Sequence, residues 1–289
     1  MTSSSPVILI AGGGRGLGKA EALYLARRGA RLVINDRGCD AEGQGHDPSL
    51  AKTCIRELQA LGTEALADDE DLSEEEGIER LLNKVIQTFG RLDAVISNLG
   101  YGFRASVLHM PISELRRYLD LHLVSNVALV QRCARIMISQ GEGGSILLNA
   151  WPLTFWGAAQ QSSLAMSSAG LFAFVRSASL ELRRHRVRIN ALAPLARTRL
   201  TQALPLFESA SPQSMKAESV APVAAYLLSP EAADVSGEIV GVAGARLYGI
   251  RWTETPGIFI DAEPWSFEEL AQQWSLLARG GPSRPPGQS

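Results

Sequence analysis

Short apolar runs alternate along the chain with segments whose apolar residues recur at helical spacing. The apolar runs are rich in Val, Ile and Leu, as in strands that are buried on both faces of a parallel sheet. The clearest runs are Val7–Ala11, Arg31–Asn35, Glu64–Asp68, Ala94–Ser97, Ser145–Asn149, Arg188–Ala193 and Glu238–Val242. Helical patterns between them include Leu17–Arg28, Leu50–Leu61, Glu74–Phe89, Ile112–Gln140 and Gln161–Arg184. This alternation predicts βαβ units with right-handed crossovers, and therefore an α/β fold built on a doubly wound parallel sheet.

The pattern changes near residue 260, which separates a main domain from an extension. We expect an N-terminal tail over 1–6, a single domain over 7–260, a C-terminal helix over 261–279 and a disordered tail over 280–289. In the extension, Phe267, Leu270, Trp274 and Leu277 recur at helical spacing. This apolar stripe would cap the core or pack on a partner subunit. The tail is rich in Gly, Pro and Ser, a composition typical of disorder.

Composition narrows the classes of function. The chain has 289 residues, 46% of them hydrophobic, which is enough to bury one large core. Its net charge of −2 gives no electrostatic reason to expect binding to nucleic acid or to an anionic membrane. No apolar run reaches the roughly 20 residues of a membrane span, and residues 1–6 lack the pattern of a signal peptide. Cys39, Cys54 and Cys133 have no metal-ligand spacing, so we expect no metal site, no disulfide framework and a cytoplasmic location.

A glycine-rich loop joins the first strand to the first helix. Glycines allow a tight turn and a close approach of the backbone to a pyrophosphate, which the N–H groups at a helix N-terminus attract. Asp36 ends the second strand, 20 residues after Gly16, a spacing that suits a carboxylate bound to ribose hydroxyls and favours NAD over NADP. Arg15 and Arg37 would instead attract a 2′-phosphate. We therefore expect a Rossmann-like dinucleotide site, with loop contacts from Gly12, Gly14, Arg15, Gly16, Leu17 and Gly18.

Two later segments would extend this site. Asp71 and Leu72 follow the third strand, where an acid can bind the adenine amino group. Asn98 and Gly100 follow the fourth strand, at the carboxyl edge where cofactors bind in open α/β sheets. The alternative for each segment is an ordinary turn.

Together these residues resemble the short-chain dehydrogenase/reductase family. The family's TGxxxGxG motif corresponds to Ala11–Gly18, and its NNAG motif corresponds to Ser97–Gly100. The family's proline segment beside the nicotinamide corresponds to Ala193–Thr198, which assigns Pro194 and Thr198 to the cofactor site.

A narrower resemblance is to the (3R)-hydroxyacyl-CoA dehydrogenase unit of multifunctional enzymes of type 2. It rests on Val33–Gly38, Leu121–Leu123, Thr198–Thr201 and Arg251-Trp252. This resemblance implies a homodimer and a site for an acyl thioester or a comparable bulky apolar molecule.

The family's catalytic residues are missing from this sequence. Family members use a Tyr as the proton donor, a Lys four residues later, a Ser about thirteen residues earlier and an Asn on the preceding helix. The chain has no Tyr-x-x-x-Lys. Aligning the strand that ends at Asn149 and the end of the following helix places Met166 at the Tyr position and Gly170 at the Lys position. The Ser position falls on Pro152 or Leu153. His122 takes the Asn position, as the resemblance to the multifunctional enzymes implies, so this change alone is not a loss.

Three hypotheses follow from these losses. The first is a non-redox, pseudo-dehydrogenase protein in which NAD is structural or absent, as a homo-oligomer or a mixed oligomer with an active paralogue. The second is a repurposed cyclase, lyase, dehydratase or isomerase. The third is an oxidoreductase with an unusual proton donor such as His122, because imidazole titrates near neutral pH; the alternative for this residue is a structural histidine. In all three, an apolar pocket would be lined, or filled, by Trp151, Leu153, Phe155, Trp156 and Met166.

Overall fold

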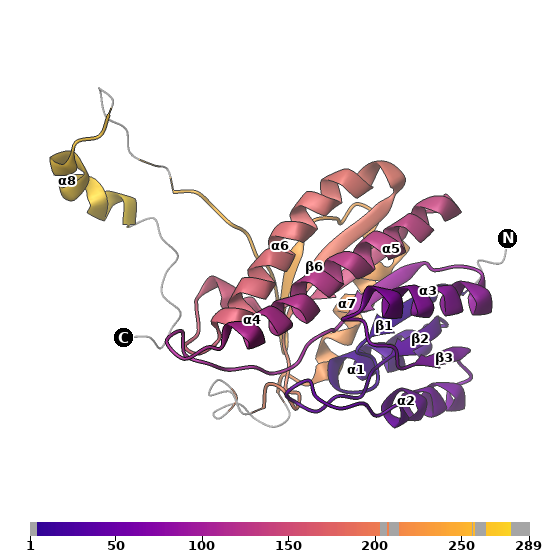
Figure 1. Ribbon diagram of the computed structural model, residues 1–289. Helices are drawn as coiled ribbons and strands as arrows, with labels where there is room; N and C mark the ends of the chain where they lie inside the picture. Colours follow the sequence, from indigo (N-terminus) through magenta and orange to yellow (C-terminus); the bar gives the residue numbers. More distant parts are fainter. Residues whose placement is uncertain (1–4, 203–206, 208–213, 256, 258–263, 279–289) are drawn as a thin grey trace. The chain divides into compact units, whose positions relative to one another are not determined.

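Eight strands form one sheet in the order β3-β2-β1-β4-β5-β6-β7-β8 (Figure 1). The computed structural model describes residues 5–202, 207, 214–255, 257 and 264–278. The strands are β1 (Val7–Ala11), β2 (Arg31–Asn35), β3 (Ala65–Asp68), β4 (Ala94–Ser97), β5 (Gly144–Asn149), β6 (Val187–Leu195), β7 (Ile239–Ala243) and β8 (Arg246–Gly249). All neighbours from β3 to β7 pair in parallel. The predicted α/β fold with a doubly wound parallel sheet is confirmed.

The edge strand β8 was not predicted. It pairs antiparallel with β7, and Ala243 and Arg246 flank a two-residue turn that contains Gly244 at φ +58°. A positive φ at such a position is favourable for glycine, so the turn is set locally. β8 has no buried residue, and so it lacks the apolar run by which the other strands were recognised.

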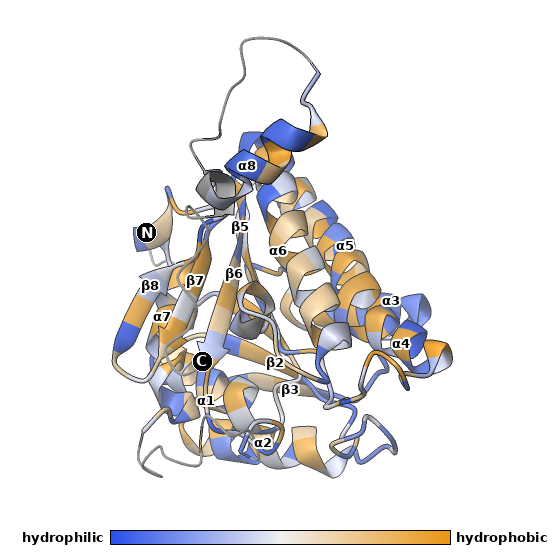
Figure 2. Cartoon of the chain, turned by 90° about the vertical axis from the view of Figure 1, so that its left-hand side faces the viewer, coloured by the Kyte–Doolittle hydropathy of each residue, from blue (hydrophilic) through white to orange (hydrophobic). Residues whose placement is uncertain are grey.

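Helices cover both faces of the sheet (Figures 1 and 2). One face carries α1 (Gly16–Ala26), α2 (Ser49–Ala60) and α7 (Ala221–Leu228). The other carries α3 (Glu75–Phe89), α4 (Ile112–Leu119), α5 (Ser125–Gln140) and α6 (Ser162–Leu182). Short single turns are η2 (Pro152–Phe155), η3 (Arg183–His185), η5 (Ala217–Ser219) and η6 (Pro230–Ala232). Two covered faces explain why the central strands are apolar on both sides.

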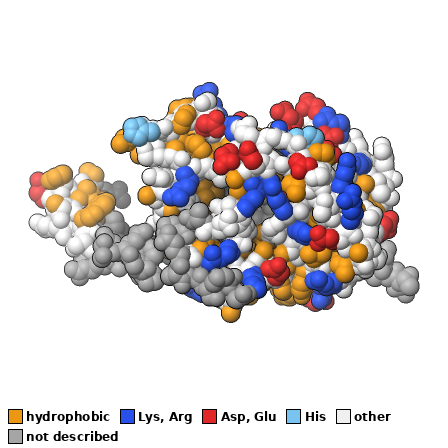
Figure 3. Space-filling view, turned by 90° about the horizontal axis from the view of Figure 1, so that it is seen from below, with side chains coloured by type: hydrophobic (Ala, Val, Ile, Leu, Met, Phe, Trp, Pro, Cys, Tyr) orange, Lys and Arg blue, Asp and Glu red, His pale blue; other side chains and the backbone are white. Residues whose placement is uncertain are grey.

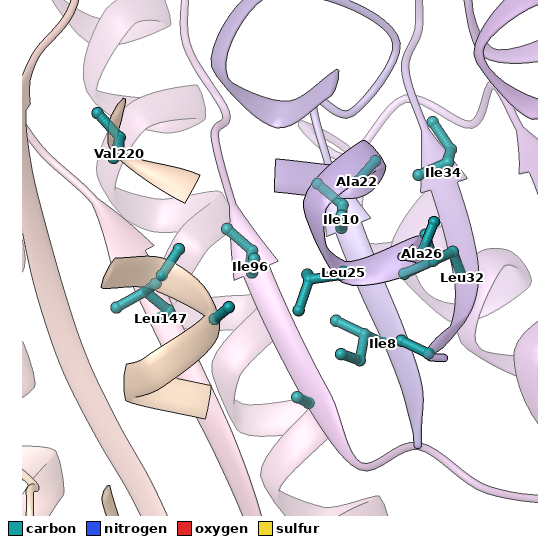
Figure 4. Packing of buried hydrophobic residues seen from close by; sticks show 14 of the residues in the cluster. Ile8, Ile10, Ala22, Leu25, Ala26, Leu32, Ile34, Ile96, Leu147 and Val220 are labelled. Atoms are coloured by element: carbon teal, nitrogen blue, oxygen red, sulfur yellow. The ribbon is translucent and has the colours of Figure 1, made fainter. Parts of the chain in front are cut away.

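Buried aliphatic side chains pack α1 against β1. All five residues of β1 are buried. In Figure 4, Leu25 of α1 lies over the sheet near Ile8 and Ile10 of β1, and these side chains belong to one buried cluster. Burial of one such aliphatic side chain contributes about 1.5–3 kcal/mol, so this layer holds α1 firmly against the strand ends.

The segment Ile112–Gln140, predicted as one helix, is interrupted. A π-helical turn, η1 (Asp120–Val124), separates α4 from α5. Such a turn inserts an extra residue into the helix and occurs often at functional sites. His122 lies at its centre, so its position differs from that in a regular helix.

The chain divides into two compact units, Met1–Gly249 and Ile250–Ser289. The second unit contains α8 (Phe267–Ala278), inside the segment for which a helix was predicted. The predicted tail over 280–289 lies outside the described residues. Among the helices of the described residues, none combines the length and apolarity needed to cross a bilayer. Basic and acidic side chains are interspersed on the face in Figure 3, which agrees with the small net charge.

Candidate functional site

A cavity of ≈ 840 Å³ opens at the carboxyl ends of the strands. Its walls come from the segments that follow β1, β2, β3, β4, β5 and β6, and from α4, η1 and α6. Ligands of open α/β sheets bind at this edge, where the direction of winding reverses. The cavity therefore lies at the sheet edge where the sequence predicts a dinucleotide site.

The glycine-rich loop is shaped by close backbone contacts. Gly12 has φ +71°, and a Cβ there would lie 2.9 Å from the Asn98 carbonyl oxygen. Gly16 has φ +55° and begins α1. The cavity is lined by Gly12, Arg15, Gly16, Leu17 and Gly18. Because the first turn of a helix has backbone N–H groups without helical partners, this loop can bind a pyrophosphate.

The Asp36 carboxylate stabilises the loop by accepting hydrogen bonds from backbone N–H groups. Its Oδ2 accepts a hydrogen bond of 2.9 Å from the Gly14 N–H, and its Oδ1 accepts one of 2.9 Å from the Gly38 N–H. Gly14, predicted to contact the cofactor, instead packs against Asp36 and does not line the cavity. Asp36 does line the cavity. Each carboxylate oxygen can accept further hydrogen bonds, so ribose hydroxyls can still bind there.

Three arginines at this end of the cavity are held by oxygen atoms of the protein. Arg37 forms an ion pair of 2.7 Å with Asp71. Arg15 donates to the Cys39 carbonyl oxygen, and Arg199 donates to the same oxygen at 3.4 Å. The guanidinium groups that would attract a 2′-phosphate therefore already have acceptors.

The other predicted cofactor positions also converge on the cavity. The lining includes Asp71, Leu72, Asn98, Gly100, Pro194 and Thr198. Thr198 is fixed by its neighbour, because its N–H donates to the Thr201 hydroxyl at 2.8 Å. Among the described residues, no group of three or more His, Cys, Asp or Glu side chains is placed to hold a metal ion.

A buried carboxyl that the sequence analysis missed lies beneath the loop. Glu21 of α1 has no exposed surface. It accepts hydrogen bonds from the Asn98 amide at 2.7 Å and from the Asn149 amide at 3.2 Å. Burial raises its pKa to about 7. The signal was an acidic residue between Ala20 and Ala22 on the buried side of α1.

His122 lines the other end of the cavity. Its Nε2 accepts a hydrogen bond of 3.0 Å from the Tyr101 N–H, and its ring stacks on Tyr118 with centroids 3.9 Å apart. Burial lowers the pKa of His122 to about 3. This shift runs against the titration near neutral pH that the sequence predicts, because the packed surroundings destabilise the charged imidazolium.

One face of α6 forms a wall of the cavity, through Leu164, Ser167, Ser168 and Leu171. Met166, predicted to line the pocket, lies on another face of the helix and is 42% exposed. Gly170 packs toward Leu123 instead, since a Cβ there would lie 3.0 Å from the Leu123 Cδ2. Ser168 is buried, and its Oγ accepts a hydrogen bond of 3.0 Å from the Trp151 N–H.

Of the predicted aromatic lining, Trp151 lies at the cavity. Phe155 is not part of the lining and stacks on Phe172, with ring centroids 5.2 Å apart. Trp156 is 39% exposed and is not part of the lining either. The Leu153 side chain lies outside the described residues. Of the aromatic residues in this segment, Trp151 therefore borders the cavity, whereas Phe155 and Trp156 lie outside its lining.

Other aromatic residues take the place of that segment. The lining includes Tyr101, Phe103 and Tyr118. The Arg117 guanidinium lies 4.7 Å from the centroid of the Tyr101 ring and donates to the Gly43 carbonyl oxygen at 2.7 Å. Tyr101 and Phe103 belong to the segment Tyr101–Met110, for which the sequence predicts a substrate loop. Tyr118 was not predicted.

Known proteins share this architecture. The family model described as enoyl-(acyl carrier protein) reductase matches residues 11–244. The peroxisomal hydratase-dehydrogenase-epimerase of Saccharomyces cerevisiae is 30% identical over 276 residues, which cover 94% of this chain and 30% of that protein. The peroxisomal multifunctional enzyme type 2 of Mus musculus is 27% identical over 94% of this chain and 36% of its own length. The chain thus spans about a third of these relatives, and the expected similarity to multifunctional enzymes is confirmed.

Two solved structures extend the comparison. A short-chain dehydrogenase from Mycobacterium avium matches with a TM-score of 0.84 and 26% identity, over 97% of both chains. A 7α-hydroxysteroid dehydrogenase complexed with NADH and 7-oxo glycochenodeoxycholic acid matches with a TM-score of 0.73 and 28% identity, over 83% of this chain and 93% of that one.

Proposed function

Because this chain belongs to the short-chain dehydrogenase/reductase family, we propose that it binds NAD(H) at the carboxyl edge of the sheet without catalysing the family's hydride transfer. The dinucleotide end of the cavity keeps the parts that such binding needs, namely the glycine loop at the α1 N-terminus and the Asp36 carboxylate. The bound NADH of the related hydroxysteroid dehydrogenase supports the choice of ligand.

The observation that carries the proposal is the identity of three residues that line the cavity. The family's spacing requires a Tyr, a Lys four residues later and a Ser about thirteen residues earlier. Leu164, Ser168 and Trp151 have this spacing, and all three line the cavity. We therefore assign the family's positions to them and no longer to Met166, Gly170 and Pro152 or Leu153. An aliphatic chain, a hydroxyl and an indole provide no tuned phenol and no ammonium group.

Neighbouring groups do not replace the lost acid. His122 is neutral at physiological pH, because its pKa is lowered to about 3. Burial raises the pKa of the Tyr101 phenol, which makes it a weaker acid than a free tyrosine. General acid–base catalysis typically contributes 10²–10⁴-fold, so we expect carbonyl reduction to be slower by about that factor or more.

The same end of the cavity favours NAD over NADP. The Asp36 carboxylate is 8% exposed and lines the cavity where the ribose would bind. A 2′-phosphate beside it would place two negative charges close together. Arg15, Arg37 and Arg199 already have oxygen acceptors and would have to leave them to compensate.

A second function is favoured by the open cavity. Since Trp151 borders it without filling it, a bulky apolar molecule can enter beside the cofactor. A non-redox reaction such as cyclisation or isomerisation would then obtain its rate from binding geometry. Incubation with apolar carbonyl compounds and chromatography of the products tests this alternative, which requires an isomeric product at unchanged NADH absorbance.

Two experiments test the proposed function: titration with cofactors, and restoration of the family's catalytic residues. Purified protein should bind NADH measurably, and more tightly than NADPH, and should leave NADH unoxidised with panels of acyl-CoA thioesters and ketosteroids. The variant with Trp151→Ser, Leu164→Tyr and Ser168→Lys should gain NADH oxidation. The matched control, Met166→Tyr with Gly170→Lys, should gain none.

Robust turnover by the unmodified chain that disappears in His122→Ala would overturn the non-redox assignment. Size measurement of the purified chain and co-purification would distinguish a homo-oligomer from a mixed oligomer with an active paralogue, the two assemblies that we propose.

A further inference from the structure

We propose that His122 donates a hydrogen bond from Nδ1 to the carbonyl oxygen of an apolar, uncharged carbonyl compound bound in the cavity. The proposal rests on the proposed function and names the chemical class of its second ligand: a ketone or a thioester rather than a carboxylate. It gives His122 the part of a fixed neutral donor and not of an acid or base.

The tautomer of His122 follows from one hydrogen bond. Nε2 accepts the Tyr101 N–H at 3.0 Å and therefore carries no proton. A neutral imidazole has a single N–H group. The proton is thus on Nδ1, which makes this atom the donor of the ring.

Packing fixes the direction of that donor. The imidazole stacks on the Tyr118 ring at an interplanar angle of 12° and meets the Tyr101 ring edge-on, with centroids 5.5 Å apart. The backbone of Gly100 closes another side, since a Cβ there would lie 3.1 Å from Nδ1. The Asn126 amide donates to the His122 carbonyl oxygen at 3.0 Å and ties the π-helical turn to α5. The ring is therefore held in place before any ligand binds.

The donor has no acceptor within the protein. Among the described residues, no hydrogen-bond partner of His122 Nδ1 is found, although the residue lines the cavity. The His122 ring stacks on Tyr118, and the cavity lining also has the apolar side chains of Leu121, Trp151, Leu164 and Leu171 beside the hydroxyls of Ser167 and Ser168. A donor in such surroundings is stabilised by any acceptor that a ligand brings, and it orients that ligand.

The uncharged state of His122 selects the acceptor. A neutral imidazole offers a hydrogen bond but no positive charge, so it compensates poorly for the desolvation of a carboxylate. Arg117 from α4 does not supply the charge, because its guanidinium covers the Tyr101 ring and donates to the Gly43 carbonyl oxygen. Arg104, which also lines the cavity, is exposed, so water screens its charge. A carbonyl oxygen meets this donor without leaving an unpaired charge.

The experiment compares two probes of nearly equal shape on the full chain with NADH present. One probe is 1-decalone labelled with ¹³C at the carbonyl, and the other is decalin, which lacks the oxygen. Calorimetry gives the two affinities, and isotope-edited infrared spectroscopy gives the carbonyl stretching frequency of the bound ketone. We expect decalone to bind about tenfold more tightly than decalin, as one net hydrogen bond allows. Its stretch should lie at lower wavenumber than in hexane.

Two variants separate donation from packing. His122→Phe should remove both the affinity difference and the infrared shift, whereas His122→Asn, which keeps an N–H donor, should retain part of each. Decalin offers no acceptor, so it should bind His122→Phe at least as tightly as the unmodified chain, because no donor is then buried unpaired.

Equal affinities of the unmodified chain for the two probes, or a stretch equal to that in hexane, would overturn the proposal whether or not the variants fold. So would an equal loss of decalone and decalin affinity in folded His122→Phe. Because NADH affinity is measured separately, failure of cofactor binding would reject the proposed function and leave the infrared result interpretable.

Discussion

The Glu21 carboxylate on α1 accepts a hydrogen bond of 2.7 Å from the Asn98 amide at the end of β4. Asn98 in turn accepts one of 2.5 Å from Asn149 at the end of β5. Both asparagines line the cavity, and a buried carboxyl therefore links the helix under the glycine loop to two strand ends at the cavity. The protonation of this group couples the site to pH.

We expect Glu21 to make the fold less stable as the pH rises. Its pKa is about 7 in the folded chain and near 4.5 in the unfolded chain, so the folded state binds more protons between these values. The contribution is complete below pH 4.5 and is lost as the pH rises to about 7. Glu21→Gln should flatten this part of the profile, by about 3 kcal/mol between pH 4.5 and 8. Urea unfolding of both proteins across this range measures the difference.

The control for Glu21 is Glu57→Gln, which removes a carboxyl paired with Lys19 at the surface. Exposed pairs of this kind contribute little, about 0–1 kcal/mol. An unfolding profile in which both variants run parallel to the unmodified chain would rule out a raised pKa at Glu21.

We expect His122 to make the fold less stable as the pH falls, which is the opposite of the effect of Glu21. Its pKa falls from 6.5 to about 3 on folding, so the unfolded chain takes up a proton that the folded chain refuses. The corresponding stability is present above pH 6.5 and is lost as the pH falls toward 3. His122→Asn should therefore lose less unfolding free energy between about pH 6.5 and 4 than the unmodified chain, because it has no imidazole that takes up a proton on unfolding. Urea unfolding of both proteins across this range gives the two slopes, and parallel profiles would contradict the lowered pKa.

The sheet was predictable because its strands carry their own signal. β1, β2 and β4 match the expected bounds, since each is a continuous apolar run ended by a polar residue or glycine. β8 and the π-helical turn at Asp120–Val124 were not predictable. The first is set by a turn and has no buried side chain, and the second depends on packing among Tyr101, Tyr118 and His122.

The sequence also predicted the glycine-loop end of the cavity better than the α6 wall. Asp36 and most of the loop glycines were found because a local motif places them. Met166 was placed two residues away from the position that faces the cavity. Two residues rotate a helix position by about 200°, so a small alignment error moves a side chain to the opposite face. The error arose in the segment before α6, where a 3₁₀ turn at Pro152–Phe155 and a positive φ of 64° at Gln160 follow no regular pattern.

Asp36→Asn should weaken NADH binding and narrow the preference over NADPH. The amide cannot accept the Gly14 and Gly38 N–H groups on both of its terminal atoms, as the carboxylate does at 2.9 Å each. It also removes the negative charge that repels a 2′-phosphate. We expect about a tenfold loss of NADH affinity, the equivalent of one hydrogen bond, and a smaller loss for NADPH.

Asp69→Asn is the control, because Asp69 pairs with His46 outside this cavity lining. Fluorescence titration with both cofactors gives the ratio, and a ratio unchanged by Asp36→Asn would reject the role of this carboxylate.

Gly12→Ala should abolish cofactor binding, because two independent constraints meet at this position. The backbone has φ +71°, which residues with a side chain rarely adopt, and the new methyl group would lie 2.9 Å from the Asn98 carbonyl oxygen.

Gly29→Ala is the matched control, because Gly29 has φ +84° but nothing lies within 4 Å of the added carbon. The control measures only the free-energy cost of placing a residue with a Cβ at a positive φ, which is about 1–2 kcal/mol. Thermal unfolding with and without NADH should therefore show a modest loss of stability for Gly29→Ala with cofactor stabilisation retained. For Gly12→Ala the loss should be larger and the stabilisation by NADH should vanish. Equal behaviour of the two variants would mean that the contact between Gly12 and Asn98 does not shape the dinucleotide site.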